Sequence, residues 1–254
     1  MKCRARLFAL ALACALAGGF ARPAAAQEIT VSAAASLQNP MREIGAAYQA
    51  AHPGATVHFN FAASGALLAQ IAQGAPVDAF ASADLETMDK AQAQGLVDAG
   101  SRVNFATNEL VLVSPRERPV SLRALADLDR AGVRRIAIGT PSTVPAGRYA
   151  RAALEKAQLW AVLTPKLVFA ENVRQSLQYV SRAEADAGFV YRSDALSAVD
   201  QVRIDFAVPT DLAVLYPIAR VSASRQRQAA GEFIAFVTGA AGQAVLARHG
   251  FGRP

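Results

Sequence analysis

The sequence predicts an α/β fold, because short β-rich runs alternate with amphipathic stretches and no repeat or low-complexity linker interrupts the chain. This alternation is typical of parallel sheets connected by crossover helices. About 228 residues follow position 26, and at 53% apolar content over the whole chain they can bury a large core in one domain or two lobes. The β-rich runs are residues 29–31, 56–61, 79–81, 110–113, 135–138, 166–169 and 188–191.

The N-terminus has the pattern of an export signal. Basic residues at positions 2, 4 and 6 precede an apolar run over residues 7–20, and small residues then lead to Ala26. The run has about 14 residues, fewer than the roughly 20 that a membrane-spanning helix needs. We therefore predict a signal peptide over residues 1–26, cleaved near Ala26, and a soluble mature chain. Lipid attachment at Cys14 is the minor alternative, because the preceding residues only loosely resemble a lipoprotein processing site.

Cysteine and charge counts exclude several classes of protein. Cys3 and Cys14 both lie in the predicted signal, so the mature chain has no thiol for a disulfide, a nucleophile or a metal site. Most of the net charge of +6 comes from the predicted signal peptide, since 22 basic and 20 acidic residues remain when it is removed. The mature chain therefore lacks the excess positive charge that would favour nucleic-acid binding, and we expect no nucleic-acid partner.

The amphipathic stretches predict helices that pack on a core. Leu37, Met41, Ile44 and Tyr48 share one helical face, and residues 67–71 and 177–180 continue the pattern in later helices. If the chain forms two lobes, it must pass between them through extended segments. The candidates are residues 105–114 and 213–221, after which a helix over 225–237 returns to the first lobe.

Four strand-to-helix junctions share small or hydrogen-bonding residues where a helix begins. Ser36 and Ser64 stand where an N-cap belongs, and Pro145 suits the first position of a helix. The fourth junction is residues 171–173, before the helix that contains Leu177. In α/β sheets, ligands bind at such carboxyl ends of strands. Capping alone would explain any single serine, but the repetition favours a binding site.

Helix starts favour negatively charged ligands. Each one presents unpaired backbone N–H groups and about half a positive charge, so four converging starts supply roughly two charges' worth of field. Such a site suits a small dianion.

Longer segments of the chain resemble the periplasmic molybdate-binding proteins of ABC transporters. The matching segments follow in order along nearly the whole mature chain, which is more specific than any one motif. They are residues 33–37, 61–64, 74–78, 82–84, 144–150, 171–174, 190–195 and 248–252.

The resemblance implies a periplasmic-binding-protein fold of type II, with two α/β lobes, a ligand cleft between them and two crossing strands. Lobe 1 would comprise residues 27–107 and 215–254, and lobe 2 residues 108–214. The implied function is capture of molybdate, and of tungstate, in the periplasm for an ABC importer. The implied partners are the membrane permease and its ATPase. We expect a monomer that is not an enzyme and needs no cofactor, molybdate being the transported ligand.

The resemblance also implies five ligand contacts. Ser36 and Ser64 would donate through hydroxyl and backbone N–H, Ala146 and Val173 through backbone N–H, and Tyr191 through its phenol hydroxyl. No residue would ligate a cation directly. Taken without the resemblance, a tyrosine on an apolar strand is more simply a core or rim residue. The next residue is Arg192, where the resemblance suggests a small residue such as glycine, and we expect its side chain to point to solvent.

A serine hydrolase is the enzyme alternative, because Ser64 follows a strand and precedes a helix, as a nucleophile elbow does. The glycine expected two residues earlier is Ala62, however. No general base is recognisable among the three histidines, His52, His58 and His249.

A hard-cation site and other oxyanions are the remaining alternatives. Acidic residues that could bind a cation are equally explained as capping or solvated carboxylates; they are Asp78, Asp84, Glu171 and Asp194. Phosphate often carries a proton near neutral pH and would need an acidic acceptor, which the five predicted contacts do not provide. Sulfate stays open as a ligand, and tungstate is not separable from molybdate.

Overall fold

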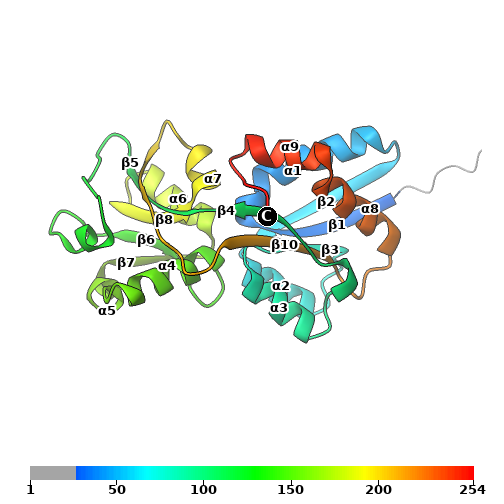
Figure 1. The fold of residues 1–254 in the computed structure, drawn as a ribbon, viewed down its shortest axis with the longest axis horizontal. Helices are drawn as coiled ribbons and strands as arrows, with labels where there is room; N and C mark the ends of the chain where they lie inside the picture. Colours follow the sequence, from blue (N-terminus) through cyan, green and yellow to red (C-terminus); the bar gives the residue numbers. More distant parts are fainter. Residues whose placement is uncertain (1–26) are drawn as a thin grey trace, which may run out of the picture.

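The computed structural model describes residues 27–254, so the predicted signal peptide with its two cysteines lies outside the described residues. Two five-stranded sheets form two separate halves of the molecule (Figure 1). The first sheet has the strand order β2-β1-β3-β10-β4, and the second has the order β7-β6-β8-β5-β9. We call the half around the first sheet the first lobe and the half around the second sheet the second lobe.

The first lobe is assembled from both ends of the described chain. Its early elements are β1 (Gln27–Ala34), α1 (Gln38–Ala51), β2 (Ala55–Ala62), α2 (Ser64–Ala72), β3 (Ala79–Ala81), α3 (Leu85–Ala93) and β4 (Val103–Asn108). Its late elements are β10 (Val214–Arg220), α8 (Arg227–Thr238) and α9 (Ala240–Arg248). The returning helix predicted over residues 225–237 is therefore α8.

The second lobe is assembled from the middle of the chain. Its elements are β5 (Leu110–Pro115), β6 (Ile136–Gly139), α4 (Pro145–Lys156), α5 (Trp160–Leu163), β7 (Leu167–Ala170), α6 (Val173–Ser181), β8 (Ala187–Tyr191), α7 (Arg192–Leu196) and β9 (Val202–Ala207). All seven β-rich runs of the sequence lie in or overlap strands.

The predicted parallel pairing is present in part of each sheet, but both sheets are mixed. In the first, β1 runs parallel to β2 and β3, whereas β10 runs antiparallel to β3 and β4. In the second, β6 runs parallel to β7 and β8, whereas β5 runs antiparallel to β8 and β9. The strands that run antiparallel to both neighbours, β10 and β5, are those through which the chain enters each lobe. No crossover helix precedes them, so nothing imposes the parallel direction.

The chain passes between the lobes twice, which confirms the two-lobe fold (Figure 1). Only Glu109 separates β4 in the first sheet from β5 in the second, so the predicted crossing over residues 105–114 is in the right place. The return runs through residues 208–213, between β9 and β10. The second predicted crossing, over residues 213–221, was placed too late, because most of it is β10 inside the first sheet.

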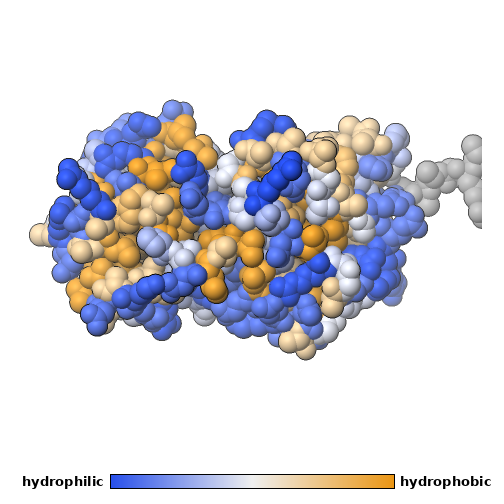
Figure 2. All heavy atoms as spheres, viewed as in Figure 1, coloured by the Kyte–Doolittle hydropathy of each residue, from blue (hydrophilic) through white to orange (hydrophobic). Residues whose placement is uncertain are grey.

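Apolar helix faces are buried as the sequence pattern predicts. Leu37, Met41, Ile44 and Tyr48 are all nearly inaccessible to solvent, and the Tyr48 ring packs edge-on against Phe233 of α8. Within residues 27–254, no single helix is long and apolar enough to span a membrane. The pair α8 and α9 reaches that threshold only together and bends by 56° at the break. On the face shown in Figure 2, polar residues are interspersed with smaller apolar areas over both lobes.

Strand register fixes the relative position of the first two junctions. Parallel pairing aligns the carboxyl ends of β1 and β2, with Ala34 opposite Ala62. Ser36 and Ser64 each follow their strand by two residues, so the register brings them to the same edge of the sheet. In the second sheet, Gly139 of β6 pairs with Ala170 of β7, and helices α4 and α6 begin beyond this edge.

Candidate ligand-binding site

The structure brings all five predicted contact residues to one small cavity between the lobes. Ser36 and Ser64 line it from the first lobe, and Ala146, Val173 and Tyr191 line it from the second. None of the five is more than 4% exposed. The cavity is small, with a volume of about 10 Å3, close to the space that a single water molecule needs. The ligand contacts of the five residues remain a prediction.

The two serines do not cap helices, contrary to the sequence interpretation. Ser36 lies in a short 3-10 turn over residues 35–37, and Ser64 is the first residue of α2, whose N-cap is Ala63. Neither helix has a side-chain cap at this end. The hydroxyls bond across the lobe instead: Ser64 Oγ accepts the Ala83 N–H at 3.0 Å, and Ser36 Oγ lies 3.0 Å from Tyr216 Oη.

The bond that Ser64 accepts leaves its own hydrogen available for a further bond. Ser64 Oγ accepts from Ala83, so its own hydrogen is free to donate elsewhere. Near Ser36, the Asn108 amide nitrogen donates to Tyr216 Oη at 3.3 Å. Either hydroxyl of the Ser36–Tyr216 pair can be the donor; donation from Tyr216 would continue this chain and free the Ser36 hydrogen in the same way. Ser64 therefore has an acceptor lone pair engaged by Ala83 and a hydrogen left to donate.

The second lobe contributes backbone donors at two helix starts. Val173 is the first residue of α6, and Ala146 follows Pro145 at the start of α4, as predicted for this proline. The first N–H groups of a helix have no partner inside the helix, and they carry its partial positive charge. Asn172 caps α6 by accepting from the Gln175 N–H at 3.1 Å, which holds this start in place.

Tyr191 occupies a fifth strand-to-helix junction that pattern reasoning missed. It ends β8 and directly precedes the short helix α7. Its ring packs against Tyr216, and its hydroxyl donates across the lobes to the Ala83 carbonyl at 3.4 Å. Burial raises the pKa of Tyr191 well above its usual value, so the phenol stays a protonated donor. Asp194, whose carboxylate accepts the Tyr191 N–H, is the sequence signal for a helix start here.

No charged side chain is among the residues that line the cavity. They are Ala34, Ala35, Ser36, Ala63, Ser64, Ala83, Val144, Pro145, Ala146, Asn172, Val173 and Tyr191. The predicted donors, hydroxyls and N–H groups at helix starts, thus belong to residues that line a site without carboxylates. This arrangement favours an anion that carries no proton of its own.

The four acidic residues considered for a cation have other partners or face solvent. Asp84 caps α3 by accepting from the Thr87 N–H, and Asp78 accepts from the Thr30 N–H. Asp194 caps the start of α7, and Glu171 is exposed. Over residues 27–254, no three histidine or acidic side chains gather as a metal site.

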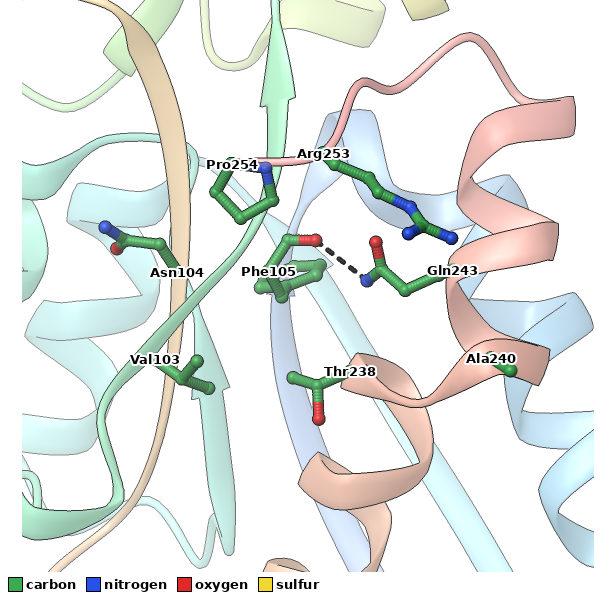
Figure 3. A pocket seen from close by; sticks show the side chains of 8 residues that line it. All are labelled: Val103, Asn104, Phe105, Thr238, Ala240, Gln243, Arg253 and Pro254. Atoms are coloured by element: carbon green, nitrogen blue, oxygen red, sulfur yellow. Dashed lines mark hydrogen bonds between the residues drawn. The ribbon is translucent and has the colours of Figure 1, made fainter.

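Other predicted features lie away from the cavity. None of the three histidines lines it: His52 stacks on Tyr48, and the other two pair with glutamates. The exposed Arg192 reaches Glu109 at 3.3 Å. A larger hollow of about 500 Å3 lies between β4, the start of α9 and the C-terminus (Figure 3). No predicted contact residue lines this hollow.

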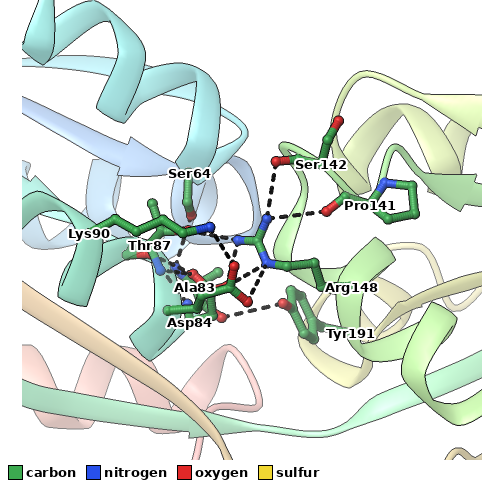
Figure 4. Close-up of polar contacts among 11 residues, drawn as sticks. Ser64, Ala83, Asp84, Thr87, Lys90, Pro141, Ser142, Arg148 and Tyr191 are labelled. Atoms are coloured by element: carbon green, nitrogen blue, oxygen red, sulfur yellow. Dashed lines mark hydrogen bonds and ion pairs between the residues drawn. The ribbon is translucent and has the colours of Figure 1, made fainter.

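Direct contacts close the two lobes around the cavity. The Gly65 N–H donates to the Thr143 carbonyl at 3.0 Å, from α2 to the loop before α4. Arg148 of α4 reaches the first lobe and pairs with Asp84, at 2.5 Å between Nη2 and Oδ2 (Figure 4). Sequence reasoning did not find this pair, although both residues lie in segments that carry the family resemblance.

Comparison with known proteins assigns the family. The sequence profile described as bacterial extracellular solute-binding protein matches residues 29–252. The chain belongs to this family. Two relatives are the molybdate-binding proteins ModA of Mycobacterium tuberculosis, 40% identical over 90% of this chain and 86% of the relative, and of Escherichia coli, 38% identical over 88% of each.

Two solved structures share the architecture. The periplasmic molybdate-binding protein of Azotobacter vinelandii superposes with a TM-score of 0.79 and 25% identity, over 89% of this chain and 99% of that one. The sulfate-binding protein SubI of Mycobacterium tuberculosis has a TM-score of 0.77 and 18% identity, over 89% and 86%. The second likeness supports the fold alone. The type II two-lobe fold predicted from the sequence is therefore confirmed.

Proposed function

We propose that this protein captures molybdate outside the cytoplasm and delivers it to an ABC importer. The observation that carries the proposal is the single cavity in which Ser36, Ser64, Ala146, Val173 and Tyr191 converge, each with a neutral donor. Relatives named as molybdate-binding proteins, at 38 to 40% identity over nearly the whole chain, support the choice of ligand.

The donor set explains why a fully deprotonated oxyanion suits the site. Hydroxyl hydrogens would come mainly from the first lobe and helix-start N–H groups mainly from the second, so a dianion would bind both lobes at once. A protonated phosphate would place its own hydrogen against another donor. Tungstate has the charge and shape of molybdate, and we expect it to bind as well.

Sulfate is the second candidate ligand, because the sulfate-binding protein SubI has the same fold. Sulfate is also a dianion that needs only donors, so charge and hydrogen bonding do not separate it from molybdate. Size does, since sulfate is the smaller anion and would leave some of the five donors without contact. We expect sulfate to bind more weakly.

The proposal includes the setting in which the protein acts. The predicted signal peptide places the mature chain in the periplasm, and a membrane permease with its ATPase would receive the ligand. We propose that the protein works as a monomer, without a cofactor or a ligated cation, and catalyses no reaction. The last point rests on Ser64, the only candidate nucleophile considered: its hydroxyl accepts from Ala83, and none of the three histidines lines the cavity to serve as its general base.

A thermal-shift panel on residues 27–254 tests the proposal. Ligand that binds only the folded state stabilises it by about 4 kcal/mol at a thousandfold excess over the dissociation constant. We expect molybdate and tungstate to raise the melting temperature by several degrees, sulfate to raise it less, and phosphate to leave it unchanged. A melting temperature that millimolar molybdate does not change would contradict the assignment. A larger rise with sulfate would favour the second candidate.

A further inference from the structure

A nearly buried ion pair connects the lobes directly beside the cavity. Arg148 lies two residues after Ala146, and Asp84 directly follows Ala83, so both partners adjoin residues that line the cavity. Arg148 Nε and Nη2 both donate to Asp84 Oδ2, at 3.0 and 2.5 Å (Figure 4). The Arg148 side chain is 17% exposed and that of Asp84 is 5% exposed. Because the pair is nearly buried, salt screens it little.

Each partner is held in place by its own lobe. Arg148 Nη1 donates to the carbonyls of Pro141 and Ser142 in the second lobe, at 3.2 and 3.4 Å. On the other side, Asp84 Oδ1 accepts from Ser82 Oγ and the Thr87 N–H in the first lobe. One edge of each charged group is thus held by hydrogen bonds within its own lobe, and the other edge faces the partner in the opposite lobe. Preorganisation of this kind lowers the entropy cost of forming the pair.

We propose that Arg148 and Asp84 form a latch that sets how long a captured ligand stays in the cavity. The proposal rests on the proposed function only in needing a ligand that binds there. It does not depend on which anion that ligand is. Arg148 also bonds Thr87 Oγ1 at 2.7 Å, so the latch holds the start of α3 as well as its cap.

The burial of the site explains why the latch would act on release. The five predicted contact residues are at most 4% exposed, so a ligand can leave only after the lobes separate. Separation breaks the Arg148–Asp84 pair and returns both groups to water. The latch therefore contributes to the barrier for opening and so slows release. A ligand enters while the cleft is open and the pair is not formed, so the latch does not affect its entry. Removing one partner should raise the dissociation rate and leave the association rate nearly unchanged.

A second arginine–aspartate pair shows that this role is specific. Arg174 follows Val173 and lies 2.8 Å from the buried Asp194, but both residues belong to the second lobe. The Arg174–Asp194 pair therefore stays intact when the lobes separate. Arg174 loses only one other contact on separation, at 3.4 Å to the Ser36 carbonyl in the first lobe. Arg148, by contrast, loses its charged partners on opening, because Asp84 and, at 3.4 Å, Glu86 both belong to the first lobe.

Stopped-flow kinetics with molybdate on three variants test the latch. Arg148→Gln and Asp84→Asn each remove the ion pair, and asparagine can still cap α3. The control is Arg151→Gln, on the same helix, where the arginine bonds Glu155 within its own lobe at 2.7 Å. We expect the first two variants to release molybdate about ten to a hundredfold faster, with association within about twofold of the parent. The control should behave as the parent does.

Two further measurements keep the test decisive. In the double variant, release should be no faster than in the faster single variant, because one interaction is removed in both. Without any ligand, amide exchange at Gly65, whose N–H bonds Thr143 across the lobes, should be faster in Arg148→Gln than in Arg151→Gln.

The outcomes separate the latch from the proposed function. A parent that binds no oxyanion contradicts the proposed function, and the exchange measurement still tests the latch. Variants that release at the parent's rate, or equal exchange at Gly65 in both variants, overturn the latch.

Discussion

The two lobes approach the cavity with different chemistry. In the proposed site, the first lobe would offer the side-chain hydroxyls of Ser36 and Ser64, whereas the second would offer the backbone N–H groups of Ala146 and Val173; all four residues line the cavity. A hydroxyl disappears when its residue is replaced, but a backbone donor persists as long as the helix start does. The second lobe should therefore tolerate substitutions that the first lobe does not. Tyr191 is the exception, because it brings a side-chain donor from the second lobe.

The largest expected effect comes from a glycine where the lobes meet. A Cβ on Gly65 would lie 2.8 Å from the Thr143 carbonyl oxygen and 2.9 Å from its Cα. Gly65→Ala should weaken molybdate binding a few hundredfold, since overpacking costs about 1 to 3 kcal/mol and the lost hydrogen bond about 1 more. Calorimetry measures this effect.

The matched measurement for Gly65→Ala is the melting temperature without ligand. Alanine favours a helix more than glycine does, so the separated first lobe should not suffer. A large drop in ligand-free stability would show that the clash lies within one lobe, contrary to the geometry described above.

Ser36→Ala and Ser64→Ala test the side-chain half of the comparison. A hydrogen bond to a charged group is worth about 1.5 to 3 kcal/mol, so each change should weaken binding roughly ten to a hundredfold. Neither serine caps a helix, so no cap is lost. Ser64→Ala also leaves the buried Ala83 N–H without its acceptor, which should cost about 1 to 3 kcal/mol of stability. Ser36→Ala should cost less, because Tyr216 keeps its bond from Asn108. Chemical denaturation and calorimetry on both variants check these values.

Tyr191→Phe tests whether the exceptional side chain of the second lobe acts as a donor. The change keeps the ring that packs on Tyr216 and removes only the hydroxyl, whose bond to Ala83 is long at 3.4 Å. We expect about a tenfold loss of affinity, at the lower end of the range for a bond to a charged group, with an unchanged melting temperature. Unchanged affinity would make Tyr191 a core residue only.

Val173→Ala tests the backbone half of the comparison and should have the smallest effect. Alanine keeps the N–H at the start of α6, so affinity should change by less than about threefold. A loss as large as that of either serine variant would mean that the Val173 side chain contributes directly, and the contrast between the lobes would fail. Calorimetry under the same conditions provides the comparison.

The sequence predicts the elements of this fold better than their connections. Residues such as Pro145 and Asn172 identify helix starts locally, and these starts do meet at the cavity. Strand direction is not a local property, so the antiparallel course of β5 and β10 was missed. The second crossing was misplaced for the same reason, because an extended segment has the same sequence pattern inside a sheet as between lobes.

The hydrogen bonds and ion pairs that support the site could not be predicted from the sequence. Local patterns explain the two serines as caps, but their partners, Tyr216 and Ala83, come from distant segments. Arg148 and Asp84 are 64 residues apart, and only the folded chain brings them together. The family resemblance indicated Tyr191 because it draws on the whole length of the chain, whereas an apolar strand pattern favours a core tyrosine.

Calorimetric titration of molybdate into residues 27–254, with EDTA present and at several pH values from 6 to 9, tests the central claim most directly. Capture by neutral donors predicts saturable binding of one anion per chain, unaffected by the chelator. Affinity should be nearly flat with pH, because no histidine lines the cavity and the raised pKa of Tyr191 keeps its phenol protonated over this range. Absence of binding, loss of binding with EDTA, or a steep change centred near pH 6.5 would contradict the account.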